Sequence, residues 1–304
     1  MLCVGFLEDD PESGQTGLIE KEDLPLGEPP MQPQRFCSNI FASLRPATLS
    51  ALLLLAAMQW PCRLVAAPVP VRFLEGLTHG FLVLRTLNGV LIASGDLSQS
   101  TRSGEVESRM LLHFKDGSLF EEKVVFTQQR VFTLKSYRLM QRGPAFTDDT
   151  VISLERATGK YHVKTKAHKN GKEDVQEGTL DLPLDVYNGG MVLTVAKNLP
   201  KGASETVHTV AFTPTPRLIQ LELAPAGEQR VLVGELAKTA TAYVFKPKLG
   251  VMLKIFATLL GRTPPDSHAW IVASETPAFV RFEGPLSITG SVWRLEPTVP
   301  RWSD

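Results

Sequence analysis

The chain has little cysteine, and all of it lies near one end. Its 304 residues include 3 cysteines, Cys3, Cys37 and Cys62, and the sequence after Cys62 contains none. That larger part of the protein therefore has neither a disulfide nor thiol chemistry. A long cysteine-free stretch is compatible with an oxidising compartment.

An excess of either charge is also lacking. Of 32 basic and 32 acidic residues, residues 1–67 hold 4 bases and 8 acids, which leaves 28 bases and 24 acids for residues 68–304. Residues 68–304 therefore have a small positive net charge, and they contain no basic block. The sequence therefore predicts that nucleic acid is not a partner.

Motifs of catalysis and metal binding are missing as well. There is no H-E-x-x-H, no G-x-S-x-G, no phosphate-binding loop and no G-x-G-x-x-G, and the 6 histidines are scattered. Asp266, Ser267 and His268 are triad residue types, but three consecutive residues cannot face one another. The adjacent carboxylates Glu121–Glu122 and Asp148–Asp149 point to opposite faces of a strand. We expect no catalytic residue, no metal site and no cofactor, although a hydrolase with a convergent site stays open.

A hydrophobic run long enough to cross a bilayer is absent, and this decides the interpretation of residues 31–67. Residues 1–30 are acidic and show no hydrophobic period, whereas residues 31–50 contain two arginines and no acid. An apolar run follows, A-L-L-L-L-A-A-M at residues 51–58, and then a short segment that ends in small residues, L-V-A-A at residues 64–67. This order is typical of a secretory signal peptide, and about 20 apolar residues would be needed for a span. A membrane anchor or a buried helix is the alternative.

What the chain does contain, from residue 71 onward, is alternation of apolar and polar residues. Asn88-Gly89, Lys115-Asp116-Gly117, Ala157-Thr158-Gly159 and Asn170-Gly171 predict tight turns between successive strands. A further turn is expected at residues 226–228. Helices do not alternate with these strands, which indicates an antiparallel sheet of about a dozen strands. Such a sheet must curl, because open twisted sheets rarely stay single beyond roughly ten strands.

Two segments interrupt the alternation. Residues 179–200 predict one central helix, with Pro183 and Asp185 in its first turn and an inward stripe of Tyr187, Met191 and Val195. The pair Gly189–Gly190 in its middle would cost roughly 2 kcal/mol relative to alanine. Such a pair is tolerated where the backbone approaches something closely, or where the helix begins after it. The apolar segment 249–261 predicts a second short helix, either in the core or as a lid over an apolar cavity.

Three segments of the sequence resemble a known protein family. The strings T-L-D-L-P-L-D-V-Y-N-G-G, L-G-R-T-P-P-D-S-H-A-W-I, and P-A-F-V-R-F-E-G-P-L with V-W-R-L-E resemble an exported bacterial family of unknown function. That family in turn looks like the LolA/LolB lipoprotein-carrier fold, an antiparallel half-barrel around helices with a cavity for acyl chains. The resemblance implies this fold over residues 71–296, and it carries over no catalytic residue.

Together these observations predict a mainly β protein: a large curved antiparallel half-barrel wrapped around one central helix. The expected organisation is a disordered or mis-assigned extension (1–30), a signal peptide (31–67) and a single domain (68–304). We expect a periplasmic or secreted, non-enzymatic protein that binds an apolar or lipid-like ligand, with transient membrane contact allowed. A structural or partner-binding module with a filled core is the alternative. The candidate ligand-binding residues are Tyr187, Met191, Leu253, Phe256, Trp270 and Trp293, although the aromatic ones also suit core packing.

Overall fold

The computed structural model of the protein describes residues 67–212, 215–233, 235–248, 265–286 and 290–300. The chain divides between Cys62 and Arg63, and the described residues all belong to the second part. The expected extension and, apart from Ala67, the expected signal peptide lie outside the described residues. So does the apolar segment 249–261, with Leu253 and Phe256.

The described part of the chain forms a 14-stranded antiparallel sheet with one α-helix, which confirms the mainly β, curved half-barrel prediction. The strand count exceeds the expected dozen slightly. The elements are β1 (Thr78–Thr86), β2 (Leu91–Arg102), β3 (Glu105–Phe114), β4 (Leu119–Gln128), β5 (Phe132–Arg142), β6 (Asp148–Glu155), β7 (Lys160–Ala167), β8 (Glu173–Thr179), α2 (Met191–Asn198), β9 (Glu205–Ala211), β10 (Arg217–Val233), β11 (Leu236–Lys248), β12 (Ser267–Val272), β13 (Ala278–Pro285) and β14 (Val292–Thr298).

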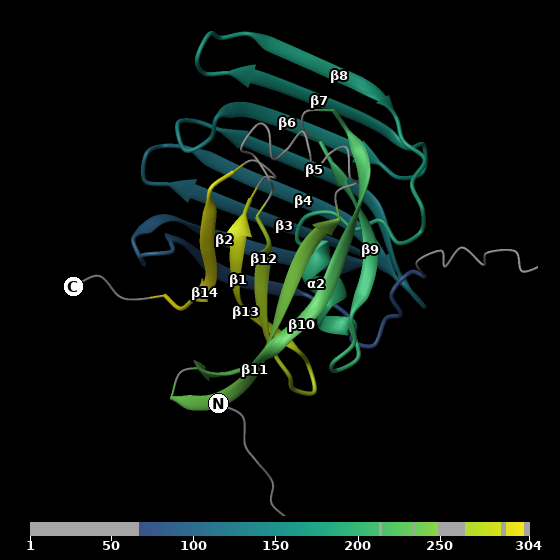
Figure 1. Cartoon of the computed structure of the whole chain (residues 1–304), viewed down its shortest axis with the longest axis vertical. Helices are drawn as coiled ribbons and strands as arrows, with labels where there is room; N and C mark the ends of the chain where they lie inside the picture. Colours follow the sequence, from purple (N-terminus) through teal and green to yellow (C-terminus); the bar gives the residue numbers. More distant parts are fainter. Residues whose placement is uncertain (1–66, 213–214, 234, 249–264, 287–289, 301–304) are drawn as a thin grey trace, which may run out of the picture. The chain divides into compact units, whose positions relative to one another are not determined.

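The strand order explains how a single sheet comes to enclose a helix. It runs β8-β7-β6-β5-β4-β3-β2-β1-β14-β13-β12-β11-β10-β9, so the first and last strands pair in the middle. The chain proceeds outward from β1 to the edge at β8, crosses through α2 to the other edge at β9, and returns to β14. The sheet curls so that β9 and β10 pass in front of α2 and of β4–β6 (Figure 1). Residues from both halves of the sheet therefore face one interior.

Four of the expected turns are confirmed, and one is wrong. The turns at residues 88–89, 115–117, 157–159 and 170–171 connect consecutive strands. The turn expected at residues 226–228 is instead a bulge inside β10, whose register against β11 shifts between Pro225 and Glu228. A bulge accommodates extra residues without ending the strand, which is why the same turn-forming residue types appear there.

The central helix is shorter than predicted. It begins only at Met191, after Gly189–Gly190, so the expected first turn at Pro183 and Asp185 is wrong. Val186 instead makes a parallel bridge to His208 of β9. The Tyr187 N–H donates to the His208 carbonyl at 2.9 Å, and the His208 N–H donates to the Asp185 carbonyl at 3.0 Å. Because β9 is an edge strand, its unpaired backbone groups satisfy this segment better than a helix interrupted by two glycines would.

The core lies between the concave face of the sheet and α2. Met191 and Val195 are fully buried, as the inward stripe predicted, and so are large side chains of β4 and β5. Thr194, which lies outside the predicted stripe, is also buried and 6% exposed. The largest fully buried side chains are Tyr187, Phe120, Phe126, Phe132, Leu84, Leu112, Leu134, Leu154, Met191 and Leu223.

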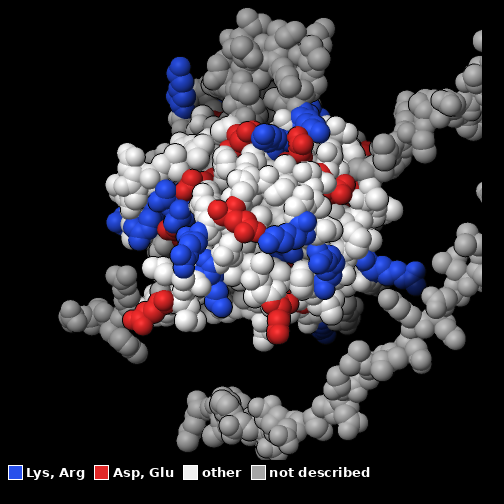
Figure 2. All heavy atoms as spheres, turned by 60° about the horizontal axis from the view of Figure 1, so that its bottom comes forward, with Lys and Arg blue, Asp and Glu red and all other residues white. Residues whose placement is uncertain are grey.

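Charges of both signs are interspersed on the outer surface. Figure 2 shows lysine, arginine, aspartate and glutamate side chains mixed over one face. Two cross-strand ion pairs link β13 and β14, with Arg281 Nε 2.8 Å from Glu296 Oε1 and Arg294 Nε 2.7 Å from Glu283 Oε1. Within the described residues, no helix has the length and hydrophobicity that crossing a bilayer requires.

Candidate functional site

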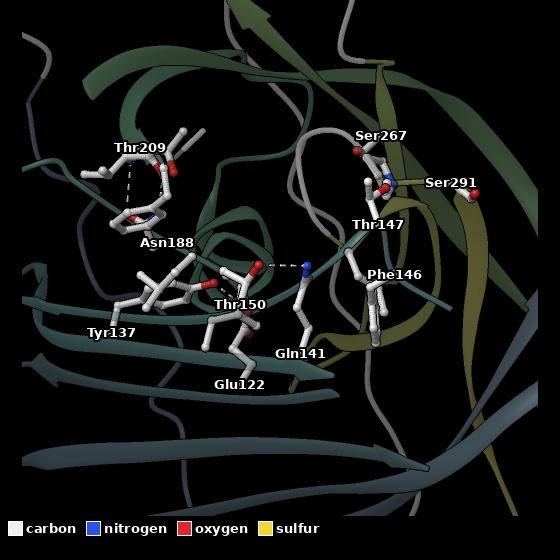
Figure 3. A pocket seen from close by; sticks show the side chains of 18 of the residues that line it. Glu122, Tyr137, Gln141, Phe146, Thr147, Thr150, Asn188, Thr209, Ser267 and Ser291 are labelled. Atoms are coloured by element: carbon white, nitrogen blue, oxygen red, sulfur yellow. Dashed lines mark hydrogen bonds between the residues drawn. The ribbon is translucent and has the colours of Figure 1, made fainter. Parts of the chain in front are cut away.

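A cavity of about 310 Å³ opens on the concave side of the sheet. Its wall comes from β4–β7 on one side, from β9–β14 on the other, and from the Asn188–Gly189 turn before α2. Figure 3 shows side chains from these elements converging on it. Its volume lies at the lower end of the range for small-molecule sites, which is roughly 300–1,000 Å³.

A second cavity of about 180 Å³ adjoins the first. The two share Glu122, Gly189 and Leu221 among their lining residues. The smaller cavity is apolar apart from Glu122 and Ser267, whereas the larger one also contains several hydroxyl, amide and carboxylate groups. Its apolar lining includes Met110, Phe120, Val192, Leu193, Phe245, Phe282 and Leu295. The combined space therefore has an apolar end and a polar end.

Glu122 stands where the two cavities meet, and its side chain is 6% exposed. Its Oε1 accepts a hydrogen bond from the Gly190 N–H at 2.7 Å, and its Oε2 accepts one from the Tyr137 hydroxyl at 3.3 Å. Burial raises the pKa of the Glu122 carboxyl, and these two hydrogen bonds oppose the rise. The same burial, together with the Glu122 charge, raises the pKa of Tyr137.

The close approach of Glu122 explains the glycine pair. Gly189 has φ +57, and a Cβ there would overlap the Glu122 carboxylate. A Cβ at Gly190 would lie 3.3 Å from Glu122 Oε1. Both explanations offered for the pair are therefore confirmed: the backbone approaches a side chain closely, and the helix begins after it.

Gln141 lines the polar end and carries a buried acceptor without a partner. Its side chain is 7% exposed, and its Oε1 has no hydrogen-bond partner within the described structure. Its Nε2 lies 3.3 Å from the Asp148 carbonyl and 3.4 Å from the Thr150 Oγ1. A carbonyl only accepts, so this contact fixes which end of the amide carries the nitrogen.

Aromatic rings line the same space. Tyr137 stacks on Phe212 with ring centroids 5.7 Å apart and an interplanar angle of 9°. Phe146 meets Trp293 edge-on at 6.3 Å. These pairs join β5 to the segment after β9, and the loop after β5 to β14. They are contacts between the two halves of the sheet.

The described candidate residues fall in three different places. Trp293 lines the larger cavity. Met191 is fully buried in the core, and so is Tyr187, whose hydroxyl accepts the Val69 N–H at 2.9 Å and whose pKa burial raises to about 12. Neither of these two is among the residues that line the cavities.

Trp270 lies on the other face of its strand from the main core. It packs with Ala240, Ala242 and Val272 in a separate small cluster, while its Nε1 donates to Gln229 Oε1 at 2.9 Å. It is not among the residues that line the cavities. Leu253 and Phe256 fall outside the described residues.

Four of the six histidines pair with carboxylates, namely His79, His162, His168 and His208. The most enclosed such pair is His208 Nδ1 with Asp185 Oδ2 at 2.6 Å, which secures the segment beside β9. Among the described residues, no three histidine, cysteine or acidic side chains lie close enough together to hold a metal ion.

The sequence analysis missed Glu122 and Gln141 as site residues, although a signal for Glu122 was present. Glu122 shares its strand face with Phe120, Val124 and Phe126, all of them buried. A carboxylate in phase with an apolar stripe is unusual, since charged groups are rarely buried without a partner. Gln141 likewise shares its strand face with the buried residues Tyr137 and Leu139, but its unpaired oxygen depends on where Asp148 and Thr150 lie.

Comparisons with known proteins found one structural similarity. No protein-family model and no curated protein matches the chain. Among solved structures, the chain is similar to a β-barrel-like protein of the domain of unknown function DUF1849 from Brucella abortus, at 8% sequence identity and a TM-score of 0.38. The match covers 77% of this chain and 98% of that chain. It does not link the chain to the lipoprotein carriers, and the fold class rests on the strand pairing described above.

Proposed function

We propose that the protein is a binding protein that holds a small amphiphile in its half-barrel. The observation that carries this proposal is the pair of adjoining cavities, one apolar and one mixed, that meet at Glu122. Ligand sites are concave, mostly apolar and equipped with a few placed polar groups. An apolar chain fits the smaller cavity, and a polar head fits the larger one.

Binding is favoured over hydrolysis by the contacts of the polar side chains. Among the described residues that line the larger cavity, Tyr137 is the one whose hydroxyl donates a hydrogen bond to a carboxylate, that of Glu122. Thr150 bonds Gln141 and a backbone carbonyl, neither of which is a general base. A hydrolase needs a nucleophile paired with a base. The geometry therefore supports holding a ligand better than cleaving one.

The test is binding of the neutral fluorophore Nile red to the purified full-length protein, with native mass spectrometry to detect any co-purified ligand. We expect Nile red fluorescence to rise with a saturable dependence on protein concentration. Leu221→Trp enlarges a side chain that lines both cavities and should abolish this signal. Gln220→Trp is the matched control, because Gln220 is the preceding residue of β10 and is exposed. Absence of Nile red binding, or equal loss in both variants, would contradict the proposal.

We also propose that the protein is exported, on the strength of the tripartite pattern in residues 31–67. Cleavage after Ala66 or Ala67 should leave a mature N-terminus near Pro68. Mass-spectrometric sequencing of the secreted material measures this terminus. A mature protein that retains Cys62 would contradict the assignment.

A further inference from the structure

The β10–β11 hairpin extends beyond the strands on either side of it. β9 pairs with β10 only as far as Leu223, and β12 pairs with β11 only from Ala240 onward. β10 and β11 stay paired with each other up to the turn between them. Residues 228–233 and 235–239 therefore form a two-stranded ribbon that leaves the sheet (Figure 1). Within the described part of the chain, no third strand borders this ribbon.

Large apolar side chains lie on both faces of the ribbon's tip. Leu232, Val233 and Leu236 are 74%, 48% and 65% exposed. Val233 pairs with Leu236, so these two share one face, and Leu232 points to the opposite face because successive strand residues alternate. Exposed apolar clusters mark contacts with proteins or membranes. A ribbon that docks on a protein surface needs one apolar face, whereas a lipid layer surrounds an inserted tip and contacts both. The arrangement therefore favours a membrane.

The charges behind the tip match a bilayer that carries anionic lipids. Arg230 and Lys238 lie two residues behind the apolar side chains, one on each face, and both are exposed. Neither forms an ion pair with a described residue, and the ribbon's Glu228 is already paired with Lys201 at 2.9 Å. Long cationic side chains reach from an apolar boundary to lipid phosphates. The remaining acid of the ribbon, Glu235, lies in the turn itself.

We propose that the tip of the β10–β11 ribbon is a membrane-docking site that inserts Leu232, Val233 and Leu236 into the surface of an anionic bilayer. Arg230 and Lys238 then contact lipid phosphates on either side of the ribbon. The Glu235 carboxylate opposes deep insertion, so the contact is shallow and reversible. The ribbon residues are not among those that line the two cavities, so this inference goes beyond the proposed function and does not depend on it.

Sedimentation of the full-length protein with lipid vesicles tests the docking site. The vesicles contain either phosphatidylcholine alone or equal parts of phosphatidylcholine and phosphatidylglycerol. We expect Leu232→Ser and Leu236→Ser each to weaken binding to the mixed vesicles roughly tenfold, since each removes a large apolar side chain from the inserted tip. Leu87→Ser is the matched control, because Leu87 is 48% exposed at the β1–β2 turn, and it should leave binding unchanged.

Charge substitutions identify the lipid class. Arg230→Gln and Lys238→Gln should each weaken binding to the mixed vesicles roughly fivefold and leave binding to pure phosphatidylcholine unchanged. Glu235→Gln should strengthen binding to both kinds of vesicle, because it removes the charge that opposes insertion. A cationic protein partner would respond to these three substitutions in the opposite direction.

A tryptophan placed at the tip reports insertion directly. Phosphatidylcholine with brominated acyl chains quenches tryptophan that enters the bilayer. Leu232→Trp should therefore show quenching beyond that of the natural protein, whereas Leu87→Trp should not. All variants retain residues 1–67, so any contribution of that segment to vesicle binding is the same in each.

Three outcomes would refute the docking site: no added quenching in Leu232→Trp, equal loss of binding in Leu87→Ser and Leu232→Ser, or a dimer in analytical ultracentrifugation that Leu232→Ser dissociates while vesicle binding persists. Nile red binding separates this proposal from the proposed function. Leu232→Ser should leave that signal unchanged, because Leu232 lines neither cavity. Loss of Nile red binding in this variant would show that the substitution acts on the fold, which would also contradict a role confined to the tip.

Discussion

Replacing Gly189 with alanine tests whether the contact between the Asn188–Gly190 turn and Glu122 organises the site. Gly189 has φ +57, where an L side chain costs roughly 1–2 kcal/mol. Its new Cβ would also displace the Glu122 carboxylate, which then loses the Gly190 N–H. A lost hydrogen bond to a buried charged group adds about 1.5–3 kcal/mol. We therefore expect Gly189→Ala to reduce the free energy of unfolding by about 2.5–5 kcal/mol.

A matched control separates the two contributions to this cost. Gly171 has a similar φ of +66, but a Cβ there would meet nothing within 4 Å. Gly171→Ala should therefore cost only the backbone term of roughly 1–2 kcal/mol. Urea unfolding followed by tryptophan fluorescence measures both values. The difference between the two variants isolates the contact with the carboxylate.

A double-mutant cycle assigns that difference to Glu122. Glu122→Ala removes the carboxylate that the new Cβ would meet, so Gly189→Ala should cost less in that background than in the natural protein. If Gly189→Ala costs no more than Gly171→Ala, or if its cost is the same in both backgrounds, the close approach is not what requires glycine at position 189.

Much of the fold was predictable because it depends on short-range patterns. The alternation in β10 places Ile219, Leu221 and Leu223 inward, and all three are buried. Turn residues marked most hairpins, since their backbone conformations are required locally. The start of α2 was harder, because the segment from Asp185 to Tyr187 is held by the edge of β9, which a local pattern does not contain.

The cavity was less predictable, because it depends on pairing between distant strands. Trp293 was identified from its position among the closing strands, but the same reasoning chose Trp270, which packs on the other face of the sheet. The aromatic residue type indicates burial and does not indicate which side of a strand is buried. Glu122 was noticed only as the neighbour of Glu121, although its phase with Phe120 already placed it inside.

Two further predictions concern the helix and the carboxylate that its first turn contacts. Met191→Ala should reduce the free energy of unfolding by about 2–4 kcal/mol, because Met191 is fully buried and its truncation leaves a cavity. Lys197→Arg, at a partly exposed helix position and with the cation that pairs with Glu75 retained, should cost less in the same urea titration, and equal costs would mean that α2 lies outside the core. The pH dependence of stability should identify Glu122 as a buried acid. Its folded-state pKa is raised above the unfolded value of about 4.3, so the protonated form favours folding and its contribution is lost as the pH rises through the folded pKa. Glu122→Gln mimics the protonated acid and does not titrate, so its stability relative to the natural protein should increase as the pH rises above about 4, by about 1.4 kcal/mol per unit of pKa shift. Unfolding free energies of both proteins at a series of pH values measure this difference, and parallel pH profiles would show that the carboxyl is solvated in the folded protein.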